Sequence, residues 1–178
     1  MNSKSVLIKF HNEKEGIATL VVHPNDHPHD SDLLDIDKNN RITEFYCKPH
    51  RKETYHRNLV NAALYLLTPE IFKYIKKNKF SDFGKNIFPN IISLGKTIYA
   101  YNTSEYIKDI GTVERLKEVE KDYLSGKVQS LNRATKQKAI FIDRDGVINY
   151  EDDPLDTPKK FNFLPGVPDA LKTINKSN

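Results

Sequence analysis

The sequence has a single cysteine, Cys47, and no apolar run that approaches the roughly 18 residues needed to span a bilayer. One cysteine excludes an internal disulfide framework and suits a reducing cytoplasm. The first residues hold no long apolar stretch and no small-residue cleavage site, so they are not a secretion signal. We therefore expect a cytoplasmic protein that neither crosses nor binds a membrane.

The charge balance is only slightly positive. The 178 residues carry 28 Lys and Arg against 24 Asp and Glu, a net charge of +4. This positive excess has two interpretations: it serves to attract anionic substrates such as nucleotides, or it reflects only a Lys-rich composition. The lysines are scattered and no dense arginine patch with interleaved aromatics occurs, which favours composition and gives nucleic-acid binding little support.

Apolar patterning predicts an α/β fold. The run at 17–23 is typical of a strand buried on both faces, as in a parallel sheet covered by helices. Residues 113–124 keep apolar side chains at helical spacing, and Gly126 is placed to end that helix. Further strands are expected at 33–36, 42–46, 59–67 and 97–101, and helices from residue 68 and near 168–175. Strands that alternate with helices indicate an α/β sheet.

The composition suggests a domain boundary. Residues 127–138 carry four positive charges and no acid, which is typical of a linker. We therefore divide the chain into a first domain at 1–125, a linker at 126–138 and a second domain at 139–178. Units of about 40 residues usually need a disulfide, a metal or oligomerisation to fold alone.

The second domain opens with a pattern that favours phosphate chemistry. The apolar run 139–142 predicts a buried strand, and Asp143 would lie at its carboxyl end, where α/β sheets bind ligands. Asp145 returns to the same face two residues later, and Gly146 allows a sharp turn. One carboxylate can attack phosphorus while the other handles protons, and magnesium would offset the repulsion between carboxylate and phosphate. The alternative is a strand followed by an ordinary acidic turn.

Residues 140–149 and 163–167 resemble the haloacid dehalogenase superfamily, and within it the D-glycero-D-manno-heptose 1,7-bisphosphate phosphatases and histidinol phosphatases. The resemblance implies that Asp143 is the nucleophile, that Asp145 is the general acid and base, and that both hold Mg²⁺. It places Asn149 near substrate. The later Thr or Ser, Lys and acidic residue of that superfamily do not appear before Asn178. We expect only its first strand, loop and helix here.

Four segments of the first domain resemble sugar-1-phosphate nucleotidyltransferases, in particular heptose 1-phosphate guanylyltransferases. They are residues 16–23, 45–50, 58–65 and 108–116. The resemblance implies a partial Rossmann-like sheet. It assigns Lys48 to the phosphate of the sugar, Asn61 to the sugar, and Asp109 to Mg²⁺.

This chain departs from the pattern of those transferases. Their Gly-rich nucleotide loop and their other metal-binding aspartate are absent, and Cys47 stands where they often have Glu. The sequence is therefore expected to be an incomplete piece that transfers nucleotide poorly, if at all.

One loop looks like a metal site. His23, Asp26, His27, His29 and Asp30 are metal-ligand types, but zinc sites prefer defined spacing with further support around the ligands. We interpret this loop as a solvated turn.

The two resemblances fall on steps of one pathway, which makes nucleotide-activated heptose for surface glycans. The leading hypothesis is a phosphatase fused to a transferase, with a heptose phosphate and a nucleoside triphosphate as substrates. Alternatives are a histidinol-phosphate or other sugar-phosphate phosphatase, a hexose-1-phosphate nucleotidyltransferase, and a non-catalytic remnant. The oligomeric state stays open.

Overall fold

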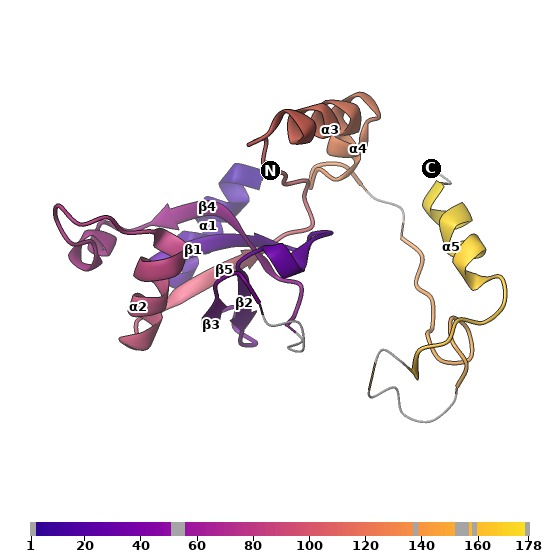
Figure 1. Cartoon of the computed structure of the whole chain (residues 1–178), viewed down its shortest axis with the longest axis horizontal. Helices are drawn as coiled ribbons and strands as arrows, with labels where there is room; N and C mark the ends of the chain where they lie inside the picture. The colour runs from indigo at the N-terminus through magenta and orange to yellow at the C-terminus, as the bar shows by residue number, and fades with distance from the viewer. Residues whose placement is uncertain (1–2, 51–55, 137–138, 152–156, 158–159, 177–178) are drawn as a thin grey trace. The chain divides into compact units, whose positions relative to one another are not determined.

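The computed structural model describes residues 3–50, 56–136, 139–151, 157 and 160–176. The chain divides into two compact units, Met1–Thr135 and Lys136–Asn178 (Figure 1). This division falls inside the segment 126–138 that was expected as a linker, whose last two residues lie outside the described part of the chain.

A five-stranded sheet forms the frame of the first unit, in the order β3-β2-β4-β1-β5. Its strands are β1 (Ala18–His23), β2 (Leu33–Ile36), β3 (Ile42–Tyr46), β4 (Val60–Leu67) and β5 (Ile98–Asn102). All five lie within one residue of their predicted bounds. The sheet is mixed rather than parallel, because β1 pairs with β5 in parallel and with β4 antiparallel.

The larger core lies on one face of this sheet. Leu20 and Val22 of β1 belong to it, together with the fully buried Phe88 of α2 (Phe88–Ser93). A π-helix, Phe83–Ile87, leads into α2, and a 3₁₀ helix, Pro69–Tyr74, stands where the sequence predicted an α-helix from residue 68. Side chains alternate across a strand, so Leu20 and Val22 enter this core while Val21 points to the opposite face.

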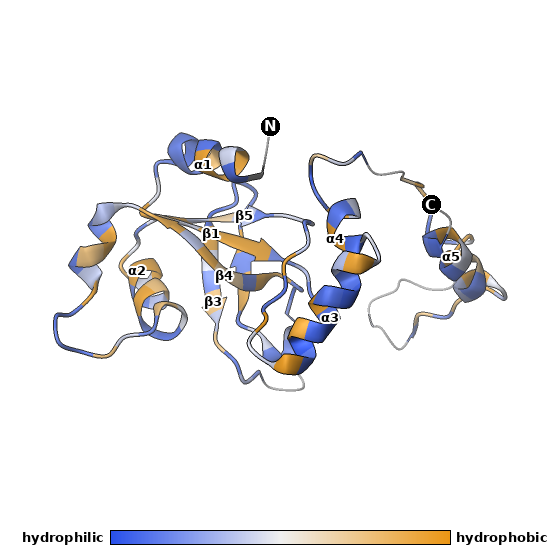
Figure 2. Cartoon of the chain, turned by 90° about the horizontal axis from the view of Figure 1, so that it is seen from above, coloured by the Kyte–Doolittle hydropathy of each residue, from blue (hydrophilic) through white to orange (hydrophobic). Residues whose placement is uncertain are grey.

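A helix at the N-terminus covers the second face. α1 (Ser3–Lys14) buries Leu7 against Val21 and Tyr101, and Phe10 meets the Tyr101 ring edge-on, with 5.4 Å between centroids. Figure 2 shows α1 and α2 on opposite sides of the sheet. The sequence did not predict α1, because its apolar residues Val6, Leu7 and Ile8 are consecutive rather than at helical spacing. In the described part of the chain, no helix is long and apolar enough to cross a membrane.

α3 (Val113–Leu124) matches its predicted bounds but is packed differently from the expectation. Thr112 caps it by accepting the Arg115 N–H at 3.3 Å, and Gly126, at φ +80°, follows its end. Every residue of α3 is at least partly exposed, including the predicted apolar face at Val113, Leu116 and Tyr123.

The segment after α3 stays with the first unit. Residues Lys127–Ser130 form the short helix α4, so the start of the expected linker is structured. Further on, Arg133 donates from Nη1 to the Tyr101 hydroxyl at 2.8 Å and from its backbone to Glu105 Oε1 at 3.0 Å. These bonds hold the segment against the end of β5.

The buried strand predicted at 139–142 is wrong. These residues form no strand, and Ile140 and Phe141 are exposed. A strand needs neighbours that satisfy its backbone groups, and the described residues of the second unit supply none beside it. The predicted helix near 168–175 is present as α5 (Val167–Lys176). The haloacid-dehalogenase-like assignment of this unit therefore stays a prediction from sequence.

The Phe88 side chain gives a test of the larger core. Phe88→Ala should lower the free energy of unfolding by about 3–5 kcal/mol, since it removes a fully buried ring and leaves a cavity. Phe80→Ala is the matched control, because Phe80 is 92% exposed and its loss should change stability by less than about 0.5 kcal/mol. Urea unfolding followed by tyrosine fluorescence measures both. Equal effects of the two changes would contradict this core.

Candidate functional site

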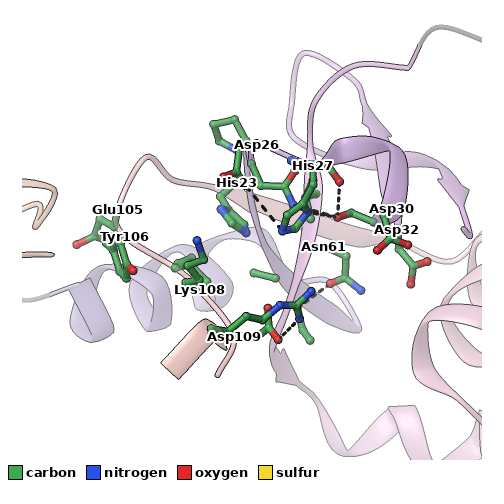
Figure 3. A pocket seen from close by; sticks show the side chains of 18 of the residues that line it. His23, Asp26, His27, Asp30, Asp32, Asn61, Glu105, Tyr106, Lys108 and Asp109 are labelled. Carbon is green, nitrogen blue, oxygen red and sulfur yellow. Dashed lines mark hydrogen bonds and ion pairs between the residues drawn. The ribbon is translucent and has the colours of Figure 1, made fainter. Parts of the chain in front are cut away.

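A pocket of about 890 Å³ lies at the carboxyl end of β1. Its walls are the loop 24–32 after β1, residues 104–109 after β5, the first half of β4, and parts of α3 and α4 (Figure 3). Ligands in α/β sheets bind beyond the carboxyl ends of strands, where backbone and loop groups are free to contact them. The pocket volume also lies in the range of about 300–1,000 Å³ that is usual for small-molecule sites.

A bulge in β4 shapes the middle of the pocket. Leu20 pairs with Tyr65 and Val22 pairs with Asn61, so three residues of β4 oppose one residue of β1. Ala63 in this bulge has φ +54°. Asn61 accepts the Ala63 N–H at 3.1 Å and donates from Nδ2 to the Tyr65 hydroxyl at 3.0 Å. The bulge therefore presents Asn61 and Tyr65 together to the pocket, a common use of bulges beside sites.

Lys48 enters the pocket from the end of the β2–β3 hairpin. Its Nζ donates to the Asp30 carbonyl at 3.2 Å and lies 3.7 Å from Asp30 Oδ1. Its backbone N–H donates to Asp32 Oδ1 at 3.0 Å. The side chain is half exposed, so the ammonium can exchange Asp30 for an incoming anion.

The histidine-rich loop after β1 is fixed by its own hydrogen bonds. Asn25 and Asn58 bond reciprocally, with Asn58 Nδ2 donating to the Asn25 carbonyl at 2.7 Å and the Asn25 N–H donating to Asn58 Oδ1 at 3.1 Å. Asn25 Nδ2 also lies 2.9 Å from His27 Nδ1 and 2.9 Å from Ser31 Oγ. The polar side chains of this loop thus order one wall of the pocket.

Asp109 lies on the opposite wall, paired with Arg115 of α3. The Arg115 guanidinium donates a hydrogen bond to the Asp109 carboxylate, which holds the pKa of that carboxyl below its usual value. The pair joins the segment after β5 to the first turn of α3.

Two more contacts continue along the same wall. Lys108 pairs with Glu118 of α3, which raises the pKa of the lysine. The pKa of the Tyr106 hydroxyl is raised to about 12, mainly because the group is partly buried and also because it donates a hydrogen bond to Asp122 at 2.9 Å. Lys127 of α4 bonds to the same Asp122 oxygen at 2.9 Å. Charged and polar pairs, rather than apolar contacts, therefore hold α3 beside the pocket.

The structure brings three of the predicted site residues to this one pocket: Lys48, Asn61 and Asp109. Sequence reasoning missed their neighbours Asp32, Tyr65, Tyr106 and Arg115, which line the same space. Arg115 and Tyr106 become relevant only once α3 lies beside residues 106–109. No pattern in the sequence indicates that placement.

The remaining predicted site residues lie in a compact loop of the second unit. Asp143 Oδ1 accepts the Arg144 N–H at 2.9 Å, and Gly146 has φ +71°. Arg144 donates to both oxygens of Asp145, at 2.8 and 2.9 Å. This bidentate contact lowers the pKa of Asp145. The expectation that a buried strand presents both carboxylates is wrong here, because residues 139–142 form no strand.

Asn149 is the buried member of this loop, at 1% exposure. Its Nδ2 donates to Asp145 Oδ1 at 3.2 Å and to the Tyr150 carbonyl at 2.7 Å. Its Oδ1 is buried, and none of the described residues provides a hydrogen-bond partner for it. Asn149 and Asp145 are therefore in contact, and their roles in a substrate site stay predictions.

Comparison with known families concerns the first unit. The family described as Nucleotidyl transferase matches residues 2–126, which include the whole five-stranded sheet and α3. The chain belongs to this family. A glucose-1-phosphate adenylyltransferase from Clostridium acetobutylicum is 31% identical to the chain over 126 residues, which are 66% of this chain and 32% of that protein. The chain thus spans about a third of the length of this curated relative.

Magnesium ligands were expected in this nucleotidyl transferase chain at Asp109, and in its second unit at Asp143 and Asp145. Within the residues that the structure describes, no group of three His, Cys, Asp or Glu side chains is placed to hold a metal ion. Asp109 is engaged by Arg115, and Asp145 by Arg144. Mg²⁺ is usually held by one or two carboxylates together with water and substrate phosphates, so the role of these residues as ligands stays a prediction.

The Asp109–Arg115 pair makes a pH-dependent prediction. Arg115→Ala should raise the pKa of Asp109 toward its ordinary value of 3.8, because the donor that favours the carboxylate is gone. A lowered pKa in the folded state stabilises the protein above the unfolded-state pKa. That contribution is lost as pH falls through the folded-state value.

NMR titration of the Asp109 carboxyl measures this shift. Lys117→Ala is the control, since Lys117 is an exposed cation on the same helix. The pair would be refuted if both variants left the Asp109 titration unchanged.

Proposed function

We propose that the pocket binds a sugar 1-phosphate and that the first unit is part of an enzyme that transfers a nucleotidyl group to it. The observation that carries this proposal is the convergence of Lys48, Asn61 and Asp109 on one pocket. They come from the β2–β3 hairpin, from β4 and from the segment after β5. Membership of the nucleotidyl transferase family supports the same assignment.

Lys48 is proposed to hold the phosphate. Its ammonium reaches into the pocket on a half-exposed side chain, and among the described residues its acidic partner is Asp30, at 3.7 Å. A phosphate dianion carries more charge and more acceptor oxygens than the Asp30 carboxylate, so it is the stronger partner for the ammonium.

Asn61 and Tyr65 are proposed to contact sugar hydroxyls. The amide offers donors and an acceptor, and the Tyr65 hydroxyl is both donor and acceptor. Their mutual bond at 3.0 Å keeps the two groups in a fixed relation within the bulge of β4. Hydroxyl groups of a sugar need this mixture of donors and acceptors.

The reaction itself makes few demands on covalent catalysis. A phosphate oxygen of the sugar phosphate attacks the α-phosphorus of the nucleoside triphosphate, the bond to the β-phosphate oxygen breaks, and pyrophosphate leaves. Such transfers depend on positioning and on cations rather than on a protein nucleophile. From the resemblance, magnesium is the proposed cation, but no step is assigned to it here.

The identity of the sugar is a finer proposal. The resemblance of the four segments 16–23, 45–50, 58–65 and 108–116 favours heptose 1-phosphate with GTP. The relative from Clostridium acetobutylicum is named for glucose 1-phosphate and adenylyl transfer, which makes glucose 1-phosphate with ATP the competing pair. Calorimetric titration of the chain with both sugar phosphates separates these possibilities. Binding of neither would favour the non-catalytic alternative.

Lys48→Met is the direct test of the phosphate site. The change should weaken binding of the preferred sugar 1-phosphate by about tenfold or more, since one charge-assisted hydrogen bond to phosphate is lost. Lys38→Met is the control, because Lys38 is an exposed lysine in the turn before β3, outside the pocket lining. Unchanged binding by Lys48→Met, measured by calorimetry, would refute this role.

Phosphatase activity is the second candidate function, proposed for the second unit. The observation that favours it is the loop that joins Asp145 to the buried Asn149 by a 3.2 Å hydrogen bond. Asp143 would attack the phosphorus of a heptose bisphosphate, and Asp145 would protonate the leaving sugar oxygen. Water, deprotonated by Asp145, would then hydrolyse the aspartyl phosphate, which releases phosphate and restores the Asp143 carboxylate. For both steps Asp145 has to leave its bidentate contact with Arg144.

Asp143→Asn tests this second candidate. The test uses a chain extended by the remaining residues of a haloacid-dehalogenase-type phosphatase domain. In it, magnesium-stimulated phosphate release from heptose 1,7-bisphosphate should fall by several orders of magnitude, because the near-isosteric amide cannot act as the nucleophile. Asp145→Asn should cost about 10²–10⁴-fold. Asp169→Asn, an exposed acid on α5, should leave release unchanged. Near-normal release by a folded Asp143→Asn protein would make residues 143–145 an ordinary acidic turn.

A further inference from the structure

Asp32 stands between the two strands that carry the candidate substrate residues. It lines the pocket immediately before β2, and its Oδ1 accepts the Lys48 backbone N–H at 3.0 Å. Its backbone carbonyl accepts the Asn61 N–H at 2.9 Å. One residue thus bonds to the backbones of both Lys48 and Asn61, which lie thirteen residues apart in the sequence.

The sheet has little else to fix this relation. β2 and β4 share a single paired position, Leu33 with Val60, and the adjoining bond runs from the Leu34 N–H to the Leu59 carbonyl at 3.0 Å. β2 and β3 pair over most of their length, so the hairpin that ends in Lys48 is stiff within itself. Among the described residues, few backbone hydrogen bonds therefore join this hairpin to β4, beside the packing of Leu34 and Ile42 in the larger core, and the bond from the Asn61 N–H to the Asp32 carbonyl is one of them.

The space around Asp32 is also shaped for its carboxylate. A Cβ built on Gly84 would lie 3.0 Å from Asp32 Oδ2, which is closer than nearly all real contacts of this kind. Gly84 is buried and lies in the π-helix that the Asp82 side chain caps. The absence of a side chain at Gly84 therefore leaves room for the second oxygen of Asp32.

We propose that Asp32 is a positioning residue, which holds Lys48 at the distance from Asn61 that a bound sugar 1-phosphate requires. The proposal rests on the function proposed above for the pocket. Asp32 acts through the Lys48 backbone. Removing its carboxylate should therefore weaken sugar-phosphate binding more than removing a comparable hydrogen bond made by a residue of β2.

Three variants isolate the carboxylate. Asp32→Ala removes the acceptor for the Lys48 N–H, while Asp32→Asn keeps an acceptor oxygen at the same place. Asp35→Ala is the matched control, because Asp35 lies three residues further on, in β2, outside the pocket lining, and accepts a hydrogen bond from the Tyr46 hydroxyl at 2.8 Å. The Asp32 carbonyl, and hence its bond to Asn61, is present in every variant.

Two measurements are made on the 178-residue chain: hydrogen exchange of the Lys48 amide by NMR, and calorimetric binding of glucose 1-phosphate and heptose 1-phosphate. Asp32→Ala should speed hydrogen exchange of the Lys48 amide. It should also weaken, by about tenfold, the binding of whichever sugar phosphate the wild type binds. Asp32→Asn and Asp35→Ala should stay within about threefold of the wild type, since each retains the Lys48 contact.

The outcomes separate the inference from the function on which it rests. If the wild type binds a sugar phosphate and Asp32→Ala binds it equally well, the positioning role is overturned while the pocket assignment stands. Unaltered Lys48 exchange in Asp32→Ala overturns the positioning contact in the same way. If the wild type binds neither sugar phosphate, the proposed function fails, and the inference fails with it.

Discussion

The first unit depends on the burial of β1 from both sides. Its neighbours β4 and β5 satisfy the strand backbone, and α1 and α2 lie over its two faces. Even the one polar side chain in its middle, Thr19, is fully buried and lies with its hydroxyl 2.8 Å from His11 Nδ1 of α1. A strand enclosed in this way offers polar groups to ligands only beyond its end, which explains why the pocket begins at His23.

The cations that line the pocket are already paired with acids, and further acids such as Asp26 and Asp82 line it as well. Each Lys or Arg that lines it has a carboxylate within ion-pair distance: Lys48 with Asp30, Lys108 with Glu118, Arg115 with Asp109, and Lys127 with Asp122. An anionic ligand therefore pairs with one of these cations only by displacing a carboxylate. Its affinity then depends on the difference in energy between the new ion pair and the one that it replaces. The loosest of these pairs is Lys48 with Asp30, at 3.7 Å. This comparison supports Lys48 as the cation that changes partner first.

The sequence predicted the strands well because burial on a pleated surface leaves apolar runs such as the β-branched 17–23 and the Leu-rich 59–67. It failed where neighbours decide the outcome. The run at 139–142 is as apolar as a core strand, yet no strand forms beside it in the described part of the second unit. Lys48, Asn61 and Asp109 were found through the resemblance of short segments to a family. Asp32 and Arg115 were missed because their importance comes from contacts across the fold, to Lys48 and Asp109, that no local pattern encodes.

The apolar face of α3 is exposed rather than packed into a core, so the two sides of the pocket differ in rigidity. The side built from β1 and β4 is anchored in a packed core, whose opening requires much of the sheet to unfold. The side built from α3 is attached by ion pairs, which dissolved salt weakens and which release in small steps. One side of the pocket is thus rigid, and the other side moves more easily. A change in salt concentration therefore acts on the α3 side of the pocket and leaves the packed side unchanged.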